Sequence, residues 1–287
     1  MASLESLKKE IQFNDRLGVL LSVMKSIASQ QFQALEKLLK PNPAFFDAIQ
    51  TIAATFNLEL LAHPFTAGTG PIGIIAVTSD VGLLGGLNQQ VILGAIREFR
   101  EAPGELLVIG RRGVAYAREH GFSCREFPGI QEDHRRALAE QVRDHALNEV
   151  LNGRLGRLSI VYPRALSFTL QRVEVIPVLP CQSWLKSATV LRGLRKGQRL
   201  LMESRVERVV EYLLWAWLSE KLYEVFGSAR LAELAARSVH LEGSTQELKR
   251  RRNKLLLRYF RMRHEVIDRG MRELAAARSL YRDEDTG

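Results

Sequence analysis

The sequence predicts an α/β protein in which long helices from both ends of the chain form an antiparallel coiled coil, with a Rossmann-like α/β domain inserted between them. All nine prolines lie between Pro41 and Pro180, so residues 181–287 contain none. A proline-free run of this length, rich in Leu, Ala, Arg and Glu, is typical of long helix. Residues 3–40 also show a helical pattern, and apolar runs alternate with helical patterns over about 70–180, as in a largely parallel sheet.

The first helix is predicted over residues 3–40. Ser3 is suited to cap its start, and Pro41 and Pro43 end it. A second, shorter helix is expected over 44–62. The long helix carries residues at a 3-then-4 spacing, which is typical of a coiled-coil seam. We expect this seam to consist of Leu17, Leu20, Met24, Ile27, Gln31, Ala34 and Leu38.

The middle of the chain changes to short apolar runs, which predict buried strands. The strands are expected over 72–79, 105–109, near Cys124, over 158–162 and over 167–178, with a proline-containing turn between the last two. Helices are expected from the end of a glycine-rich turn to about Arg100, over 112–120 and over 131–152. We therefore divide the chain into an N-terminal helical segment, an inserted α/β domain and a C-terminal long helix, over residues 1–64, 65–182 and 183–287.

The C-terminal helix is expected after a basic link at 192–197, from about Leu200, and Gly227 and Gly243 are candidate breaks or bends. At 100° per residue its later part shows two apolar stripes. A helix packed on one core needs only one apolar face, so two stripes predict one partner inside the chain and one outside. The first stripe is Leu248, Leu255, Tyr259, Met262 and Val266, and the second is Leu256, Leu257, Phe260 and Ile267.

The chain is basic, with 41 Lys and Arg against 32 Asp and Glu and a formal net charge of +9. Residues 249–263 contain eight cations and no acid, which favours an acidic partner: nucleic acid, an anionic membrane surface or an acidic protein. The apolar residues between the cations favour a protein. We call these cations the basic belt: Lys249, Arg250, Arg251, Arg252, Lys254, Arg258, Arg261 and Arg263.

A glycine-rich turn at residues 78–88 separates a predicted strand from a helix, where phosphate-binding loops occur. Its glycines fit neither G-x-G-x-x-G nor the P-loop pattern, so a structural turn is favoured, in which Asp80 or Asn88 caps backbone amides. A nucleotide-binding α/β enzyme remains the alternative. The six histidines and two cysteines show no metal-ligand spacing, and we find no catalytic constellation, no signal peptide and no apolar run of about 18–20 residues. The turn's glycines are Gly82, Gly85 and Gly86.

Three motifs resemble those of one known family, the gamma subunit of F-type rotary ATP synthases. Residues 78–88, T-S-D-V-G-L-L-G-G-L-N, are similar to the family's S-T-D-R-G-L-C-G-G-L-N, and 109–113 to its I-G-K-R-G. Residues 23–28 resemble the M-K-x-V-A pattern of the opening helix. Residues 259–268, followed by Glu273 and Leu274, resemble Y-N-K-x-R-Q-x-x-I-T and its following E-I.

The chain departs from the family pattern at several positions. Val81 and Leu84 stand where the family has Arg and Cys, and His264 and Asp268 where it has Gln and Thr. The C-terminal helix is also more basic than the family pattern. These departures suggest an alternative rotary ATPase, such as a sodium-translocating one.

The resemblance implies a non-catalytic rotor shaft without cofactor or metal, peripheral on the cytoplasmic face of a bacterial membrane. Its partners would be the alpha and beta subunits, the epsilon subunit and the membrane c-ring, with no nucleic acid. The first stripe would pack on the N-terminal helix near Met24, and the second would face the head. A basic coiled-coil protein that binds nucleic acid or serves as a scaffold is the other alternative. The expected partner contacts are Met24, Lys25, Arg250, Arg251, Lys254, Arg258, Phe260, Arg261, Arg263 and His264.

Overall fold

The computed structural model describes residues 3–53, 63–101, 104–181 and 204–284. The chain divides into two compact units: Met1–Ile27 with Ser238–Gly287, which we call the coiled-coil unit, and Ala28–Arg237, which we call the α/β unit. The elements are α1 (Leu4–Leu38), α2 (Pro43–Ala53), α3 (Pro64–Ala67), β1 (Ile72–Val77), α4 (Leu87–Glu101), β2 (Glu105–Ile109), α5 (Arg111–Glu119), β3 (Arg125–Phe127), a 3-10 turn (Glu132–His134), α6 (Arg135–Leu151), β4 (Arg157–Ala165), β5 (Gln171–Leu179) and α8 (Val206–Glu284).

The α/β unit is built on a five-stranded sheet in the order β3-β2-β1-β4-β5. β1 is parallel to both β2 and β4, with Ile74 opposite Leu106 on one side and Ser159 on the other. β5 runs antiparallel to β4 at one edge. All six residues of β1 are buried, which explains its continuous apolar sequence. The predicted mixture of a parallel sheet with long terminal helices is confirmed.

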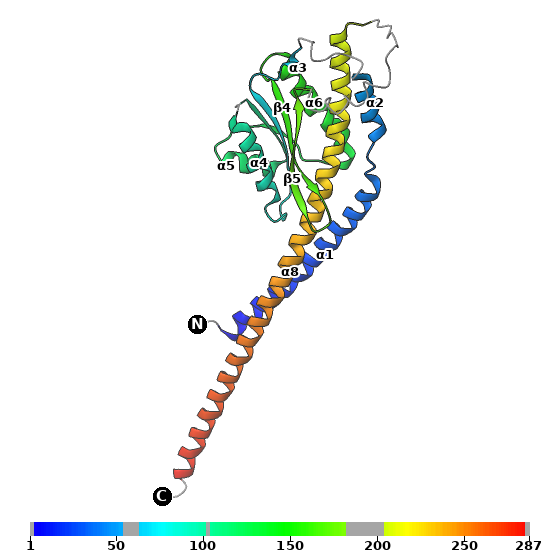
Figure 1. Ribbon diagram of the computed structural model, residues 1–287. Coiled ribbons are helices and arrows are strands. Elements are labelled where there is room, and N and C mark those ends of the chain that lie inside the picture. The colour runs from blue at the N-terminus through cyan, green and yellow to red at the C-terminus, as the bar shows by residue number, and fades with distance from the viewer. Residues whose placement is uncertain (1–2, 54–62, 102–103, 182–203, 285–287) are drawn as a thin grey trace. The chain divides into compact units, whose positions relative to one another are not determined.

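Helices cover both faces of this sheet, which gives the α/β unit two apolar layers (Figure 1). On one face α4 and α5 pack against alternate residues of β1 and β2, with Val91 and Ile92 fully buried. On the other face lie α6 and the first part of α8, where Leu214, Leu218 and Phe226 are buried. The beginning of α8 is therefore a layer of the α/β unit, whereas we predicted boundaries at 64/65 and 182/183 from chain order alone.

The coiled-coil unit pairs α1 with the later part of α8, but the predicted seam on α1 is only partly right: Leu17 and Met24 are half-buried, and its other members are exposed. Leu20 and Ile27 are exposed, at 55% and 49%. A complete row of buried or half-buried residues follows a 3-then-4 spacing in another frame: Leu4, Leu7, Ile11, Asn14, Gly18, Leu21 and Lys25. This seam includes an amide, a glycine and an ammonium, so the hydrophobic pattern of the sequence favoured the opposite, more apolar face.

Several local predictions also need correction. Neither Gly227 nor Gly243 interrupts α8, which continues for 79 residues. Pro163 lies within β4 and not in the turn, which is closed by hydrogen bonds between Ser167 and Leu170. The strand tolerates this proline because β4 pairs with β1 only as far as Val161, so one side is unpaired beyond it.

Other predictions fall outside the described residues. These are the basic link at 192–197, the helix start near Leu200 and the part of the second helix after Ala53. Across the described segments, no helix combines the length and the apolar character that a membrane span requires.

Candidate functional site

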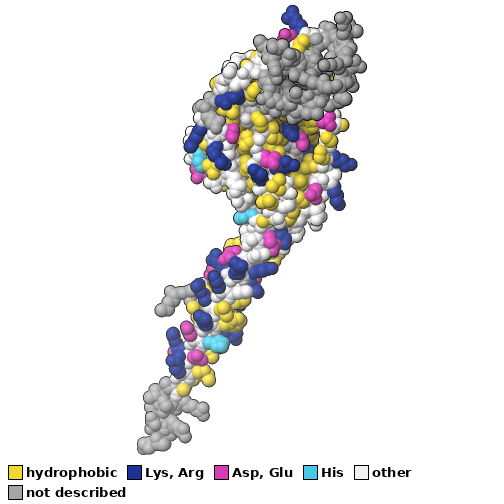
Figure 2. Space-filling model, in the orientation of Figure 1, with side chains coloured by type: hydrophobic (Ala, Val, Ile, Leu, Met, Phe, Trp, Pro, Cys, Tyr) yellow, Lys and Arg dark blue, Asp and Glu magenta, His cyan; other side chains and the backbone are white. Residues whose placement is uncertain are grey.

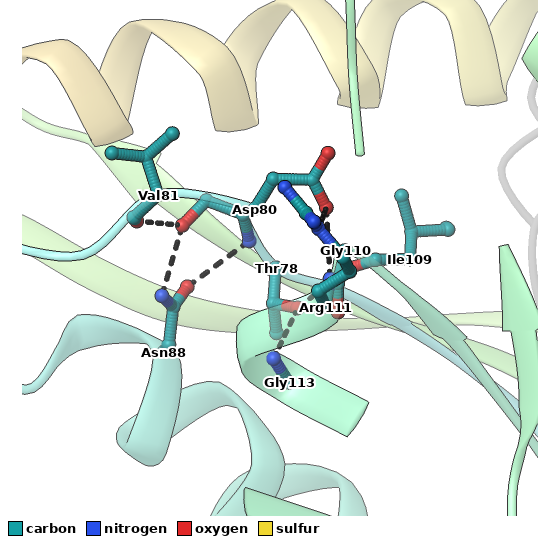
Figure 3. Close-up of polar contacts among 9 residues, drawn as sticks. Thr78, Asp80, Val81, Asn88, Ile109, Gly110, Arg111 and Gly113 are labelled. Atoms are coloured by element: carbon teal, nitrogen blue, oxygen red, sulfur yellow. Dashed lines mark hydrogen bonds and ion pairs between the residues drawn. The ribbon is translucent and has the colours of Figure 1, made fainter. Parts of the chain in front are cut away.

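The glycine-rich turn connects the end of β1 to the start of α4 through a small hydrogen-bond network (Figure 3). The Ser79 amide donates to Asn88 Oδ1 at 3.2 Å, and Asn88 Nδ2 donates to Ser79 Oγ at 2.9 Å. Ser79 Oγ in turn donates to the Val81 carbonyl at 2.7 Å. Asn88 lies in the first turn of α4, so these bonds hold the helix to the strand and use the polar groups of the turn internally.

The side chain of Asp80, which lies in the turn after β1, caps the start of α5. Its Oδ1 accepts a hydrogen bond from the Arg111 amide at 2.9 Å and lies 3.7 Å from Arg111 Nε. The N-terminus of a helix favours a negative charge, and here the chain's own carboxylate supplies it. A phosphate at the start of α5 would meet this carboxylate, and at the start of α4 the polar groups of Ser79 and Asn88 already bond each other, so the geometry disfavours the nucleotide-binding alternative.

The second motif, at 109–113, packs against the same turn through Thr78. Thr78 Oγ1 donates to the Ile109 carbonyl at 2.5 Å and accepts from the Gly113 amide at 3.1 Å. Gly110 has a φ of +94°, and a Cβ there would lie 2.7 Å from the Ser79 carbonyl carbon. The two motifs thus form one structure, in which Gly110 permits the close approach of two backbone segments.

The turn also fastens the sheet to α8 within the α/β unit. Leu84 and Leu87 pack with Ala236 of α8 in a small buried cluster. Gly85 and Gly86 have positive φ angles of +59° and +90°, which explains their presence without any ligand. Leu84, which replaces the family's Cys, supplies part of this apolar contact.

The basic belt is exposed along α8 in the coiled-coil unit (Figure 2). Three of its arginines already contact acids within this unit: Arg251 lies 2.6 Å from Glu10, Arg252 lies 2.6 Å from Asp15, and Arg250 lies 3.7 Å from Glu247. Among the described residues, no acidic partner is seen for the remaining belt cations, which include the predicted contacts Lys254, Arg258, Arg261 and Arg263.

The cross-helix contacts correct the predicted register of the pair. Lys25, expected to contact a partner, lies 2.7 Å from Glu242, and Met24 beside it is half-buried. Leu248 lies farther along, where it lines a groove of about 320 Å³. The first stripe therefore does not centre on Met24. The other lining residues are Asn14, Asp15, Gly18, Val19, Ser22, Thr245, Lys249 and Arg252.

Both helices of the coiled-coil unit keep a second apolar stripe exposed. On α8 it includes Leu257, Phe260 and Ile267 as predicted, and Val266, expected inside, is exposed as well. His264 is also exposed. On α1 the stripe consists of Phe13, Leu20, Val23 and Ile27. Sequence reasoning noticed part of this α1 stripe but assigned it to the inner seam.

Several titratable groups of the α/β unit are engaged in structural contacts. His63 Nδ1 accepts from the Phe65 amide, and its Nε2 lies 3.2 Å from Glu211. Burial raises the pKa of the Cys181 thiol to about 11, so this group stays protonated near neutrality. The described part of the chain contains no group of three or more His, Cys, Asp or Glu side chains placed to hold a metal.

Comparison with known proteins gives consistent matches. A family model described as ATP synthase matches residues 3–279. The ATP synthase gamma chain of Clostridium pasteurianum is 22% identical over 281 residues, covering 96% of this chain and 97% of the relative. That of Bdellovibrio bacteriovorus is 23% identical over 290 residues, covering 96% and 98%.

Solved structures give the same picture of the fold. The rotor of the Euglena gracilis mitochondrial ATP synthase has a TM-score of 0.64 at 14% identity, covering 92% of this chain and 98% of that one. The central stalk of the Tetrahymena thermophila enzyme has a TM-score of 0.58 at 16% identity, covering 78% and 99%. Because the family model spans nearly the whole sequence, this chain belongs to the ATP synthase family, and the resemblance found in its motifs is confirmed.

Proposed function

We propose that this chain is the gamma subunit of a rotary ATP synthase, the central shaft that couples ion flow through a membrane ring to ATP synthesis or hydrolysis in a catalytic head. The observation that carries the proposal is the coiled-coil unit, where both helices leave an apolar stripe exposed and α8 carries belt cations for which the described residues supply no acidic partner. Large exposed apolar stripes mark interaction surfaces. The gamma-chain relatives, which match almost the entire length, support the same assignment.

In this proposal the coiled-coil unit contacts the alpha and beta subunits, and the α/β unit contacts the epsilon subunit and the c-ring. The complex would lie at the cytoplasmic face of a bacterial membrane. The chain itself performs no chemistry. Rotation of an asymmetric shaft changes its contacts with each catalytic site, and a difference in contact energy between two states is what shifts their populations. The purified chain alone should therefore hydrolyse no ATP.

The second apolar stripe and the free belt cations would form the contact with the head. An exposed cation contributes only about 0–1 kcal/mol, so no single one should be essential for assembly. Arg258 and Arg261 lie three residues apart and are both exposed, so they act on one side of α8. Phe260 is 47% exposed and would enter an apolar surface of the partner.

The test compares charge reversals in the assembled complex. Arg258→Glu with Arg261→Glu should leave assembly intact and reduce ion pumping per ATP hydrolysed. Phe260→Asp should be more damaging, because it places a charge in an apolar contact. The matched control is Arg97→Glu with Arg100→Glu, two exposed arginines with the same spacing on α4. If the belt variant matches wild type in assembly, hydrolysis and pumping at low and moderate salt, the belt does not face the head.

The two alternatives make different predictions. A nucleotide-binding enzyme would bind ATP at the turn, and titration calorimetry of the isolated chain would detect it; Asp80 at the start of α5 argues against this outcome. A nucleic-acid-binding protein would bind with a steep dependence on salt. Either result would contradict the proposed role.

A further inference from the structure

Two buried arginines of α6 stack on two aromatic rings of α8 inside the α/β unit. Arg135 Cζ lies 4.1 Å from the centre of the Tyr223 ring, and Arg143 Cζ lies 4.0 Å from that of Trp215. Both arginines are more than nine-tenths buried. The arginines are eight residues apart on α6, and the rings are eight residues apart on α8 in the opposite order. The two stacks therefore match each other in an antiparallel helix pair.

Further contacts hold each guanidinium in place. Arg143 Nη1 donates to Ser219 Oγ at 2.6 Å, and its Nε donates to Asp144 Oδ1 at 2.8 Å. Arg135 Nη1 lies 3.2 Å from Glu132 Oε2, too far from hydrogen-bond alignment to count as more than an ion pair. A Cβ at residue 227 would clash first with Leu39 Cδ2 and would also come within 2.8 Å of Arg135 Nη1. Gly227 thus forms a notch in α8 that accepts the ends of the Leu39 and Arg135 side chains.

Such contacts restrict sliding more than apolar packing does. Packed helices can slide past one another by small shear movements. The two stacks lie about 12 Å apart along the helix axes, so both can form at once in only one register of α6 against α8. A shift by one turn would take both guanidinium groups from their rings and leave two buried charges poorly compensated, which is costly.

We propose that these two stacks form a register lock, which makes the sheet and the long helix turn as one body, with Arg135 and Arg143 as its positioning residues. The inference rests on the proposed rotor function, because a lock matters where torque passes from α8 to the sheet. The Gly227 notch explains a glycine inside an unbroken helix, where it costs stability relative to alanine.

The test uses the assembled complex in lipid vesicles, with ATP hydrolysis and the membrane potential reported by a voltage-sensitive dye measured together. Arg135→Ala with Arg143→Ala should lower the potential reached per ATP hydrolysed by at least about twofold, because slipped registers become populated, while hydrolysis continues. Replacing both arginines by lysine should not restore coupling, since an ammonium lacks the planar group that stacks. Arg136→Ala is the control for an exposed contact between the same helices: Arg136 stacks on the Tyr223 ring at 4.4 Å and lies 3.7 Å from Glu220 of α8, but it is exposed.

A second pair of variants keeps the test decisive if the double variant fails to assemble. Gly243→Ala meets nothing within 4 Å and should raise the melting temperature of the chain by about 2–4 °C. Gly227→Ala meets both Leu39 and Arg135 and should instead lower the melting temperature. The lock predicts that coupling falls as well, and this second readout is the one that reports on Arg135.

The outcomes separate the lock from the rotor function. Wild-type coupling in the double alanine variant, or full rescue by lysine, overturns the lock. Equal effects of alanine at 227 and 243 also overturn it. If the wild-type complex itself builds no potential on ATP hydrolysis, the proposed function fails, whatever the variants do.

Discussion

The α/β unit and the coiled-coil unit differ in how completely they bury their apolar residues. In the α/β unit, Ile74, Ile75 and Ile160 have no exposed surface, and helices cover both faces of the sheet. In the coiled-coil unit the seam is narrow and includes a buried amide, and exposed apolar stripes remain on both helices. The first unit buries its apolar residues within itself, whereas the second leaves apolar area that a partner could cover.

The same contrast appears in the charges. The α/β unit buries Arg135 and Arg143 against aromatic rings. The coiled-coil unit places its cross-helix ion pairs at the surface, where solvent screens them. Charged side chains thus fix the packing geometry of the α/β unit, whereas the surface ion pairs add little to the stability of the coiled-coil unit.

The largest expected effect is on the sheet. Ile74→Ala removes a fully buried side chain between two layers and should lower the free energy of unfolding of the α/β unit by about 2–5 kcal/mol. Ile27→Ala, the same change at an exposed position, should alter stability by less than about 0.5 kcal/mol. Urea unfolding of both variants measures the difference, and similar losses would contradict the contrast between the units.

Removal of residues 1–24 should have the next largest effect. It should destabilise the coiled-coil unit and leave the α/β unit folded. The later part of α8 would lose its pairing surface, because a helix of this kind gains most of its stability from packing. Amide hydrogen exchange should become fast over 245–275 and stay slow over β1 and β2. Unchanged protection of α8 would mean that α1 does not stabilise it.

A change at Asn14 should strengthen the weaker unit. Asn14 is almost fully buried, and its Nδ2 has no hydrogen-bond partner among the described residues. Asn14→Leu should therefore stabilise the helix pair by about 1 kcal/mol, at some cost in register specificity. Gln12→Leu, on the exposed side of the same helix, is the control for added hydrophobicity. Thermal melting by circular dichroism should show the gain for Asn14→Leu alone.

The smallest effect concerns pH. Hydrogen bonds from Lys25 and Gln246 lower the pKa of Glu242 below its ordinary value of 4.5. The ionised form is thus favoured in the folded state, so this contribution to stability is present above pH 4.5 and is lost as the pH falls through the lowered pKa. Melting curves of wild type and Lys25→Met should differ near pH 6 and converge in acid. If the melting temperatures of the two proteins differ by the same amount at all pH values, the ionisation of Glu242 is not the cause of the difference.

The sequence predicted the α/β unit better than the coiled coil. The continuous apolar run at 72–77 and the glycines after it are local signals, and β1 and the turn appear where they were expected. The seam of α1 was largely misassigned because the exposed face is more apolar than the buried one. Pro163 was misplaced because a strand with one unpaired side accepts proline.

The arginine stacks and the Gly227 notch had no recognisable sequence signal. Residues 131–152 look like an ordinary charged helix, and Trp215 looks like a core residue, although 43% of it is exposed. Whether these residues contact one another depends on which face of α6 packs against which face of α8. Only the packing of segments that are far apart in the sequence decides this. The cross-helix partners of Arg251 and Arg252 were hidden for the same reason.

The exposed stripe of Phe13, Leu20, Val23 and Ile27 has a consequence for handling and biosynthesis of the protein. A row of large apolar side chains on a rod-like helix pair can meet the same row on another copy, so the free chain should self-associate as its concentration rises. A partner that covers the stripe would compete with this process. Production together with the head subunits should therefore yield more soluble protein than production alone, and in the cell synthesis close to those subunits would limit the time for which the stripe stays uncovered.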